Sequence, residues 1–195
     1  MRIFLIMFIL GFSATLRAEL VDYLMTDMKG REGVSVQGYQ YSPRDSRDNL
    51  GNRVEDWMPA VYFYHFNTRS SSLEFGVGLW DESTNSLRSR IRPVTAGISF
   101  YDNLENNFKF YYGGDLGVFR LETEVRDTKG VVRSFSESDV GGQLKLGLAY
   151  LLNPDFWFKM EARYTGCTIH SIFPNAPEDS NISDCNWGGS LIALF

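Results

Sequence analysis

The sequence predicts an all-β protein, an eight-stranded antiparallel up-and-down β-barrel that spans a membrane. Apolar and polar residues alternate with a period of two along most of the chain, which is the period of a β-strand. Short turns alternate with longer polar loops between these segments, as they do in transmembrane barrels. Glycine is frequent on the polar faces, and aromatic residues gather at the ends of the apolar faces. Both patterns favour a packed polar interior with lipid outside.

The clearest pattern is a hairpin over residues 141–166, with a tight turn at residues 153–155. One face of each strand is apolar or aromatic. The opposite face of the second strand carries three long charged side chains, Lys159, Glu161 and Arg163. This hairpin alone leaves open whether its apolar face meets lipid or a protein core.

The other elements complete the count of eight. The first strand of the hairpin starts near residue 131 with a polar stretch and becomes apolar from Val140. Both alternating sets of the segment 57–66 are apolar, so its facing stays open. The remaining predicted strands cover residues 34–42, 57–66, 73–80, 90–101, 108–125 and 186–195.

The predicted strand over residues 108–125 marks the limit of the apolar layer. Alternate positions are apolar from Phe108 to Val118 and then become Arg120, Glu122 and Glu124 in the same register. The apolar part covers roughly eleven residues, close to the length that a tilted strand needs to cross a membrane.

The N-terminal residues 1–18 have the pattern of a signal peptide, with Arg2, an apolar run and small residues before a cleavage site. Cleavage after Ala18 or after Ala14 fits the pattern, and a membrane anchor is the alternative. Residues 19–33 form a lead-in, either unstructured or a short helix, and residues 34–195 form the barrel.

Composition excludes several other classes. The mature chain has no apolar run of eighteen residues, so it predicts no transmembrane helix. The formal net charge is -5, and removing Arg2 and Arg17 makes it -7. Lysine and arginine form no cluster in the sequence, so nucleic acid is not expected as a partner.

Seven charged side chains are predicted to point into the barrel. Both signs occur among them, and buried charges must be paired, so we expect a salt-bridged plug. A charged pore is the alternative, although eight strands leave an interior only wide enough for side chains. The seven residues are Glu74, Lys109, Asp115, Lys145, Lys159, Glu161 and Arg163.

Cys167 and Cys185 flank the longest predicted outer loop. An exported chain with two cysteines in one loop is expected to form a disulfide between them. No metal or cofactor site is expected, since only one histidine, His170, lies near the two cysteines. His65 lies near a short turn and is interpreted as an interfacial aromatic residue, so no catalytic group is predicted.

The layout of eight strands, the glycine–aromatic alternation and the terminal aromatic residue resemble the small bacterial outer-membrane barrels of the OmpA, OmpX and opacity-protein kind. In that family, a C-terminal pattern like Leu191, Ala193 and Phe195 serves as a signal for the outer-membrane assembly machinery. The resemblance implies the bacterial outer membrane as location and outer-membrane lipids as surroundings.

The resemblance does not fix a function. It implies a non-enzymatic, monomeric barrel with a cell-surface interaction or envelope-structural role, and its outer loops are the expected place for a host or envelope ligand. A narrow channel for small or apolar solutes is the alternative, and a lipid-modifying enzyme is the second alternative.

Overall fold

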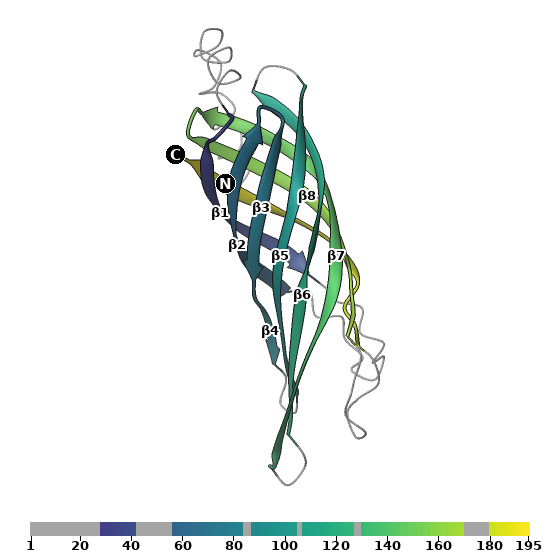
Figure 1. The fold of residues 1–195 in the computed structure, drawn as a ribbon. Helices are drawn as coiled ribbons and strands as arrows, with labels where there is room; N and C mark the ends of the chain where they lie inside the picture. The colour runs from purple at the N-terminus through teal and green to yellow at the C-terminus, as the bar shows by residue number, and fades with distance from the viewer. Residues whose placement is uncertain (1–27, 42–55, 84–86, 105–106, 127–129, 170–179) are drawn as a thin grey trace, which may run out of the picture.

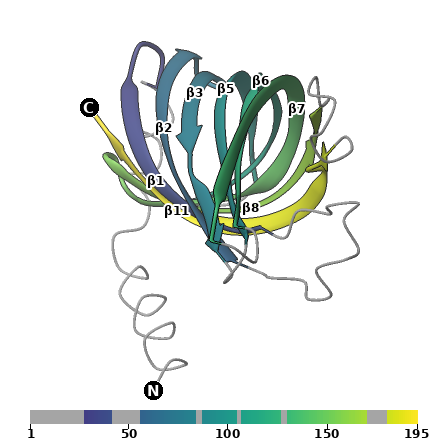
Figure 2. The same cartoon turned by 90° about the horizontal axis from the view of Figure 1, so that it is seen from below.

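The computed structural model describes residues 28–41, 56–83, 87–104, 107–126, 130–169 and 180–195. These residues form a closed antiparallel ring of strands (Figure 1), and the view along the ring shows its wall (Figure 2). Within these ranges the structure has no helix able to cross a membrane. The ring consists of β1 (Glu32–Tyr41), β2 (Asp56–Thr68), β3 (Ser71–Gly78), β4 (Trp80–Ser83), β5 (Leu87–Asn103), β6 (Phe108–Arg126), β7 (Val132–Asn153), β8 (Phe156–Gly166) and β11 (Asp184–Leu194).

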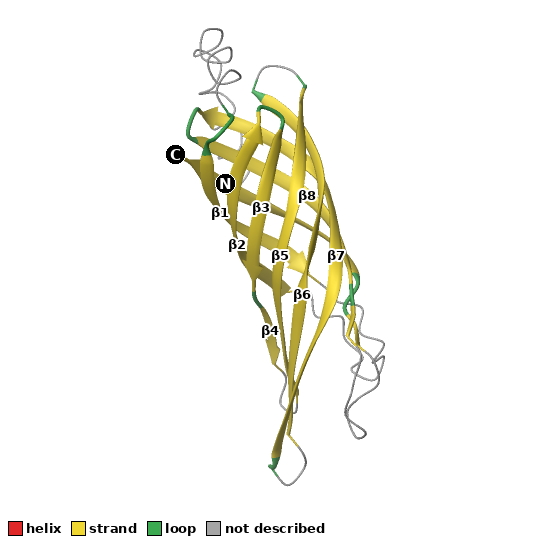
Figure 3. Cartoon of the chain, in the orientation of Figure 1, coloured by secondary structure: helices red, strands yellow, loops and turns green. Residues whose placement is uncertain are grey.

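The ring has eight positions, because β3 and β4 are consecutive pieces that both pair with β5. Each other strand pairs with the next along the chain, and β1 pairs with β11 to close the barrel. The up-and-down barrel predicted from the sequence is therefore confirmed. Figure 3 shows the strands with their short connecting turns.

Strands β6 and β7 form the longest ladder within the ring, since all 19 residues of β6 pair with β7. The ladder runs from Phe108 opposite Tyr150 to Arg126 opposite Val132. The outer parts of β5, β6 and β7 continue well past the other strands, toward the tip at the foot of Figure 1. We call residues 119–126 of β6 and 132–139 of β7 the outer ribbon.

Alternate burial along the strands defines two faces. On β8 buried and exposed residues alternate from Phe156 to Thr165, and every exposed residue is apolar or aromatic. Leu116 is 73% exposed and Leu144 is 68% exposed. We call these outward-facing side chains the apolar belt. Its members include Val61, Phe63, Leu73, Phe75, Val77, Val94, Phe100, Tyr112, Leu116, Val118, Leu144, Leu146, Leu148, Phe158, Met160, Trp187 and Leu191.

The apolar belt is much larger than the apolar patches that soluble monomers expose. Its outward position, opposite a polar interior, is the arrangement that a lipid environment requires. The belt ends where the strand β6 passes from Val118 to Arg120, as the sequence predicts.

Three details differ from the sequence prediction. The third predicted strand is interrupted at Leu79, between β3 and β4. The last loop contains a small strand pair, β9 (Thr168–Ile169) with β10 (Ser180–Asn181), where no strand was expected. The expected signal peptide lies outside the described residues, and β1 begins at Glu32 within the expected lead-in.

The structure also decides the facing of β2. Tyr62, Tyr64 and Phe66 are buried inside, while Trp57 and Phe63 point outward. The sequence could not choose between these sets because both are apolar or aromatic.

The two ends of the described chain meet at the short-turn end of the barrel. Arg31 donates to the carbonyl of Pro154 at 2.8 Å and pairs with Asp155 at 2.6 Å. Backbone hydrogen bonds join Phe195 to Glu32 at 2.9 and 3.1 Å. The C-terminal residues Leu191 and Phe195 lie on the outer surface of the closing strand, and Ala193 between them is half-buried.

The close approach of β7 and β8 gives the first prediction. A Cβ atom added to Gly147 would lie 2.1 Å from the Met160 carbonyl oxygen, whereas one added to Gly142 would lie no closer than 3.6 Å to any atom. We expect Gly147→Ala to lower the free energy of unfolding by roughly 1–3 kcal/mol through overpacking. Gly142→Ala serves as the matched control and should change it little. Urea titration in detergent measures both, and an equal loss would contradict the facing of β7.

Candidate functional site

The centre of the barrel holds one ammonium group between two carboxylates. The Lys145 Nζ atom lies 2.7 Å from Glu74 Oε2 and 2.6 Å from Asp115 Oδ1. The three side chains are at most 1% exposed. Glu74 comes from β3, Asp115 from β6 and Lys145 from β7, so the contact crosses the interior of the ring.

A second ion pair lies in the same layer. Arg163 contacts Glu161 at 2.5 Å, and its guanidinium also donates to Gln143 at 3.0 Å and to the Tyr39 hydroxyl at 2.8 Å. It donates to the Tyr62 hydroxyl as well. Four hydrogen-bonding side chains, each from a different strand, therefore hold one buried guanidinium.

The other two predicted interior cations lie over aromatic rings. Lys159 Nζ lies 3.9 Å from the ring centre of Tyr111 and 5.1 Å from that of Tyr64. Lys109 Nζ lies 5.4 Å from the ring centre of Trp157. In the described part of the chain neither makes an ion pair within 4.0 Å. The structure thus places all seven predicted charged residues inside, but only five in salt bridges.

Sequence reasoning missed the tyrosines that complete this interior. Tyr111 donates to Glu161 Oε2 at 2.8 Å, and Tyr101 donates to Glu74 Oε1 at 3.2 Å. Tyr64 accepts from Gln37 at 2.7 Å. No signal in the sequence marks the facing of each tyrosine, because a tyrosine fits the barrel interior and the lipid boundary equally well.

Apolar side chains close the interior on both sides of the charged layer. At the short-turn end Phe66, Tyr101 and Trp157 pack with ring centres 5.5 to 5.8 Å apart. At the outer end buried apolar residues from β4, β5 and β6 lie in adjacent register, namely Trp80, Ile91, Phe119 and Leu121. The interior along these layers is filled by side chains.

The expected disulfide is not formed, since Cys167 and Cys185 are both free. Cys167 is buried and faces inward, next to Gly141, whereas Cys185 is exposed on the outer face. The register explains the difference, because Cys185 lies opposite Tyr164 and the Cys167 carbonyl accepts from the Ile182 amide. Cys167 and Cys185 therefore lie near the ends of neighbouring strands but point to opposite faces of the wall.

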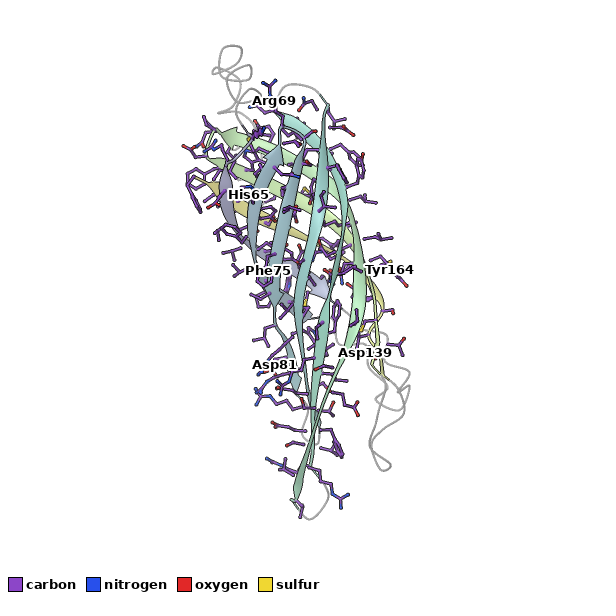
Figure 4. All side chains as sticks on the ribbon, in the orientation of Figure 1. His65, Arg69, Phe75, Asp81, Asp139 and Tyr164 are labelled. Carbon is purple, nitrogen blue, oxygen red and sulfur yellow. The ribbon has the colours of Figure 1, made fainter. Side chains whose placement is uncertain are left out.

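The structure describes one of the two histidines. His65 is half-exposed near the short-turn end (Figure 4), 3.5 Å from Glu32. His170 lies outside the described residues. The described residues contain no cluster of three metal-ligating side chains.

The outward face of the strands just beyond the apolar belt is charged. Asp81 accepts two hydrogen bonds from Arg88, at 2.9 and 2.7 Å, and one from Arg90 at 2.8 Å. The two hydrogen bonds from Arg88, together with the one from Arg90, hold the pKa of Asp81 well below its usual range. Figure 4 shows Asp81 beyond the level of Phe75 and Tyr164, toward the tip.

Two arginines lie directly opposite each other at the edge of the belt. Arg92 and Arg120 are cross-strand partners and share one carboxylate oxygen of Glu122, each at 3.1 Å. Arg120 also donates to Ser136 at 3.0 Å. Their side chains remain 45% and 53% exposed. We call Arg92 and Arg120 the rim arginine pair.

Comparison with known proteins supports the fold. No protein-family model and no curated protein sequence matches the chain. Among solved structures, Neisserial surface protein A is 13% identical, with a TM-score of 0.67 over 86% of this chain and 100% of that one. The outer membrane protein OprG of Pseudomonas aeruginosa is 15% identical, with a TM-score of 0.59 over 88% and 98%. The attachment invasion locus protein Ail of Yersinia pestis is 14% identical, with a TM-score of 0.58 over 86% and 99%.

These similarities establish the class of fold. The chain is a small eight-stranded transmembrane barrel of the outer-membrane type, which confirms the fold that the sequence resemblance implied. At 13 to 15% identity the comparison does not extend to function.

The central ion triad gives the second prediction. Lys145→Met leaves two buried carboxylates without their cation, so we expect it to lower the free energy of unfolding by roughly 3–5 kcal/mol. Lys109→Met, the matched control, removes a cation–π contact and should cost at most about 2 kcal/mol. Urea titration in detergent compares the two. A larger loss for Lys109→Met would contradict the assigned interior contacts.

Proposed function

We propose that this protein is a closed, non-enzymatic barrel of the bacterial outer membrane, and that its outer ribbon contacts ligands at the cell surface. The observation that supports this most strongly is the contrast between the membrane-spanning part of the barrel and the outer ribbon. The membrane segment has a filled interior, whereas the β7 half of the outer ribbon is exposed or half-exposed on both of its faces.

The filled interior argues against solute transport. A lumen wide enough for water would leave its lining accessible, yet Tyr64 and Tyr111 are 0% exposed and Lys159 is 1% exposed. Apolar layers on both sides of the charges oppose ion passage further. These features favour a surface role over the channel alternative.

The outer ribbon has the properties of a contact surface. It projects beyond the apolar belt as a regular β-ladder, so its side chains are held by backbone pairing. Its outward face on β6 is charged, and Val131 and Val132 near the tip are about half exposed. Loops and extensions carried by a rigid barrel are common sites of recognition. One structural neighbour, Ail, has been solved with the heparin analogue sucrose octasulfate.

The third prediction tests the surface role by shortening the outer ribbon. Deleting the four cross-strand pairs from Thr123–Phe135 to Arg126–Val132 removes the distal ribbon and leaves the belt intact. Cells that display this variant should lose binding to immobilised matrix glycoproteins and sulfated polysaccharides that cells displaying the intact protein bind. The loss follows from removal of the contact surface.

A second measurement separates folding from binding. The shortened protein should keep the gel mobility difference between heated and unheated samples that folded barrels show. In planar bilayers both proteins should give no unitary conductance steps. Binding of every probe at the intact level after shortening, or stepwise conductance by the intact protein, would overturn the proposal.

A further inference from the structure

The apolar belt contains a groove. Three outward-facing glycines, Gly114 on β6, Gly142 on β7 and Gly166 on β8, form its floor. Larger side chains border them, including Ile98, Leu116 and Leu144, and the volume of this open groove is about 840 Å³. We call this feature the glycine groove.

The glycine groove runs across the strands. Its lining spans five strands and includes one cross-strand row, in which Gly114 belongs to the floor and the larger residues to the border. This row consists of Leu73, Ile98, Gly114, Leu144 and Tyr164. Five neighbouring strands at their usual spacing give a length of roughly 19 Å. A groove of this length, lined by apolar side chains and open to the bilayer, has the shape and chemistry of a seat for one acyl chain.

The rim arginine pair lies on the outward face of β5 and β6, which also line the glycine groove. From Leu116 to Arg120 there are four residues along β6, which is roughly 13 Å of strand. The same separation joins Ala96 to Arg92 on β5. The groove and the arginines therefore belong to one continuous surface, with the arginines at the edge of the belt on the side of the longer loops.

Among the described residues, the positive charge at this edge is only partly balanced. Two guanidinium groups face each other across a strand pair and share the single carboxylate of Glu122. Like charges directly opposite each other destabilise a sheet. Arginine binds phosphate oxygens with paired hydrogen bonds, and an anion placed here would relieve the repulsion.

We propose that this surface binds one anionic, phosphate-bearing lipid of the outer leaflet. The phosphate contacts Arg92 and Arg120, and one acyl chain lies in the glycine groove. The inference requires insertion in a membrane but does not depend on the proposed surface role. A second copy of this chain is a poorer occupant, since it would bring a second arginine pair toward a positive edge.

The test measures binding of lipid A, a phosphorylated multi-acyl lipid, to the detergent-solubilised full chain by native mass spectrometry. In the double variant Arg92→Gln with Arg120→Gln we expect the affinity to fall roughly tenfold to thirtyfold, since each basic residue near a lipid surface contributes on the order of 1 kcal/mol. Dephosphorylated lipid A should bind the unchanged protein about as weakly. The matched control, Arg126→Gln with Arg133→Gln, removes the same charge from the outer ribbon and should leave the affinity unchanged.

The groove is tested separately. An added Cβ at Gly142 meets no atom within 3.5 Å, so Gly142→Leu fills the groove without disturbing the wall. It should weaken binding of both lipid forms by a similar factor. Gly189→Leu is the control, because Gly189 faces outward elsewhere in the belt, and its added Cβ would lie 3.4 Å from the nearest atom. Heat-dependent gel mobility confirms that each variant is folded.

Several results would overturn the proposal. Equal binding by the rim double variant and the ribbon control would remove the phosphate contact. Inorganic phosphate that binds as tightly as lipid A would show that the acyl chain contributes nothing. A dimer that forms without lipid and disappears in Gly142→Leu would identify a second copy of the chain as the occupant. Retention of lipid binding by the ribbon-shortened protein is expected, and it separates this inference from the surface role.

Discussion

The contact of Lys145 with Glu74 and Asp115 is the constraint on which the rest of the barrel depends. Lipid surrounds the wall, so charged groups in the spanning strands must find their partners inside. Glu74 lies three strand positions round the ring from Lys145, yet their charged atoms are 2.7 Å apart. Such a contact is possible only in a narrow ring, and eight strands provide an interior of that width. The wall and its polar contents therefore require each other.

The tyrosines allow this interior to be both polar and closed. Their hydroxyl groups bind Glu161, Glu74 and Arg163, and their rings fill space and cover Lys159. A set of charges alone would need water to satisfy the remaining donors and acceptors. The tyrosine hydroxyl groups and rings supply contacts that water would otherwise have to make. The surface role proposed above depends on this closure, because a sealed barrel leaves its outer part as the place for contact.

The sequence predicted the facing of a strand wherever one face was marked by charge or glycine. This holds for β3, for β6 and for the β7–β8 hairpin. It failed to decide β2, because tyrosine suits an interior and a lipid boundary equally well. It could not pair Glu74 with Lys145, which are 71 residues apart, since alternation gives direction but not position round a ring. The disulfide prediction was wrong for a related reason: a cysteine near a strand end has a facing that only the register fixes.

At the rim of the belt, local rules disagree. Along most of the described strands, alternation and packing support the same arrangement, as expected of a sequence that specifies one fold. At Arg92 and Arg120 the register places two cations face to face with one carboxylate between them. Folding alone gives no reason for this, because either arginine could be neutral without loss of the ladder. The conflict lies where the apolar belt meets the outer strands, beside a groove left by three glycines. Two arginines that share one carboxylate beside an apolar groove are complementary to an anionic lipid, and this complementarity is the physical basis of the lipid site proposed above.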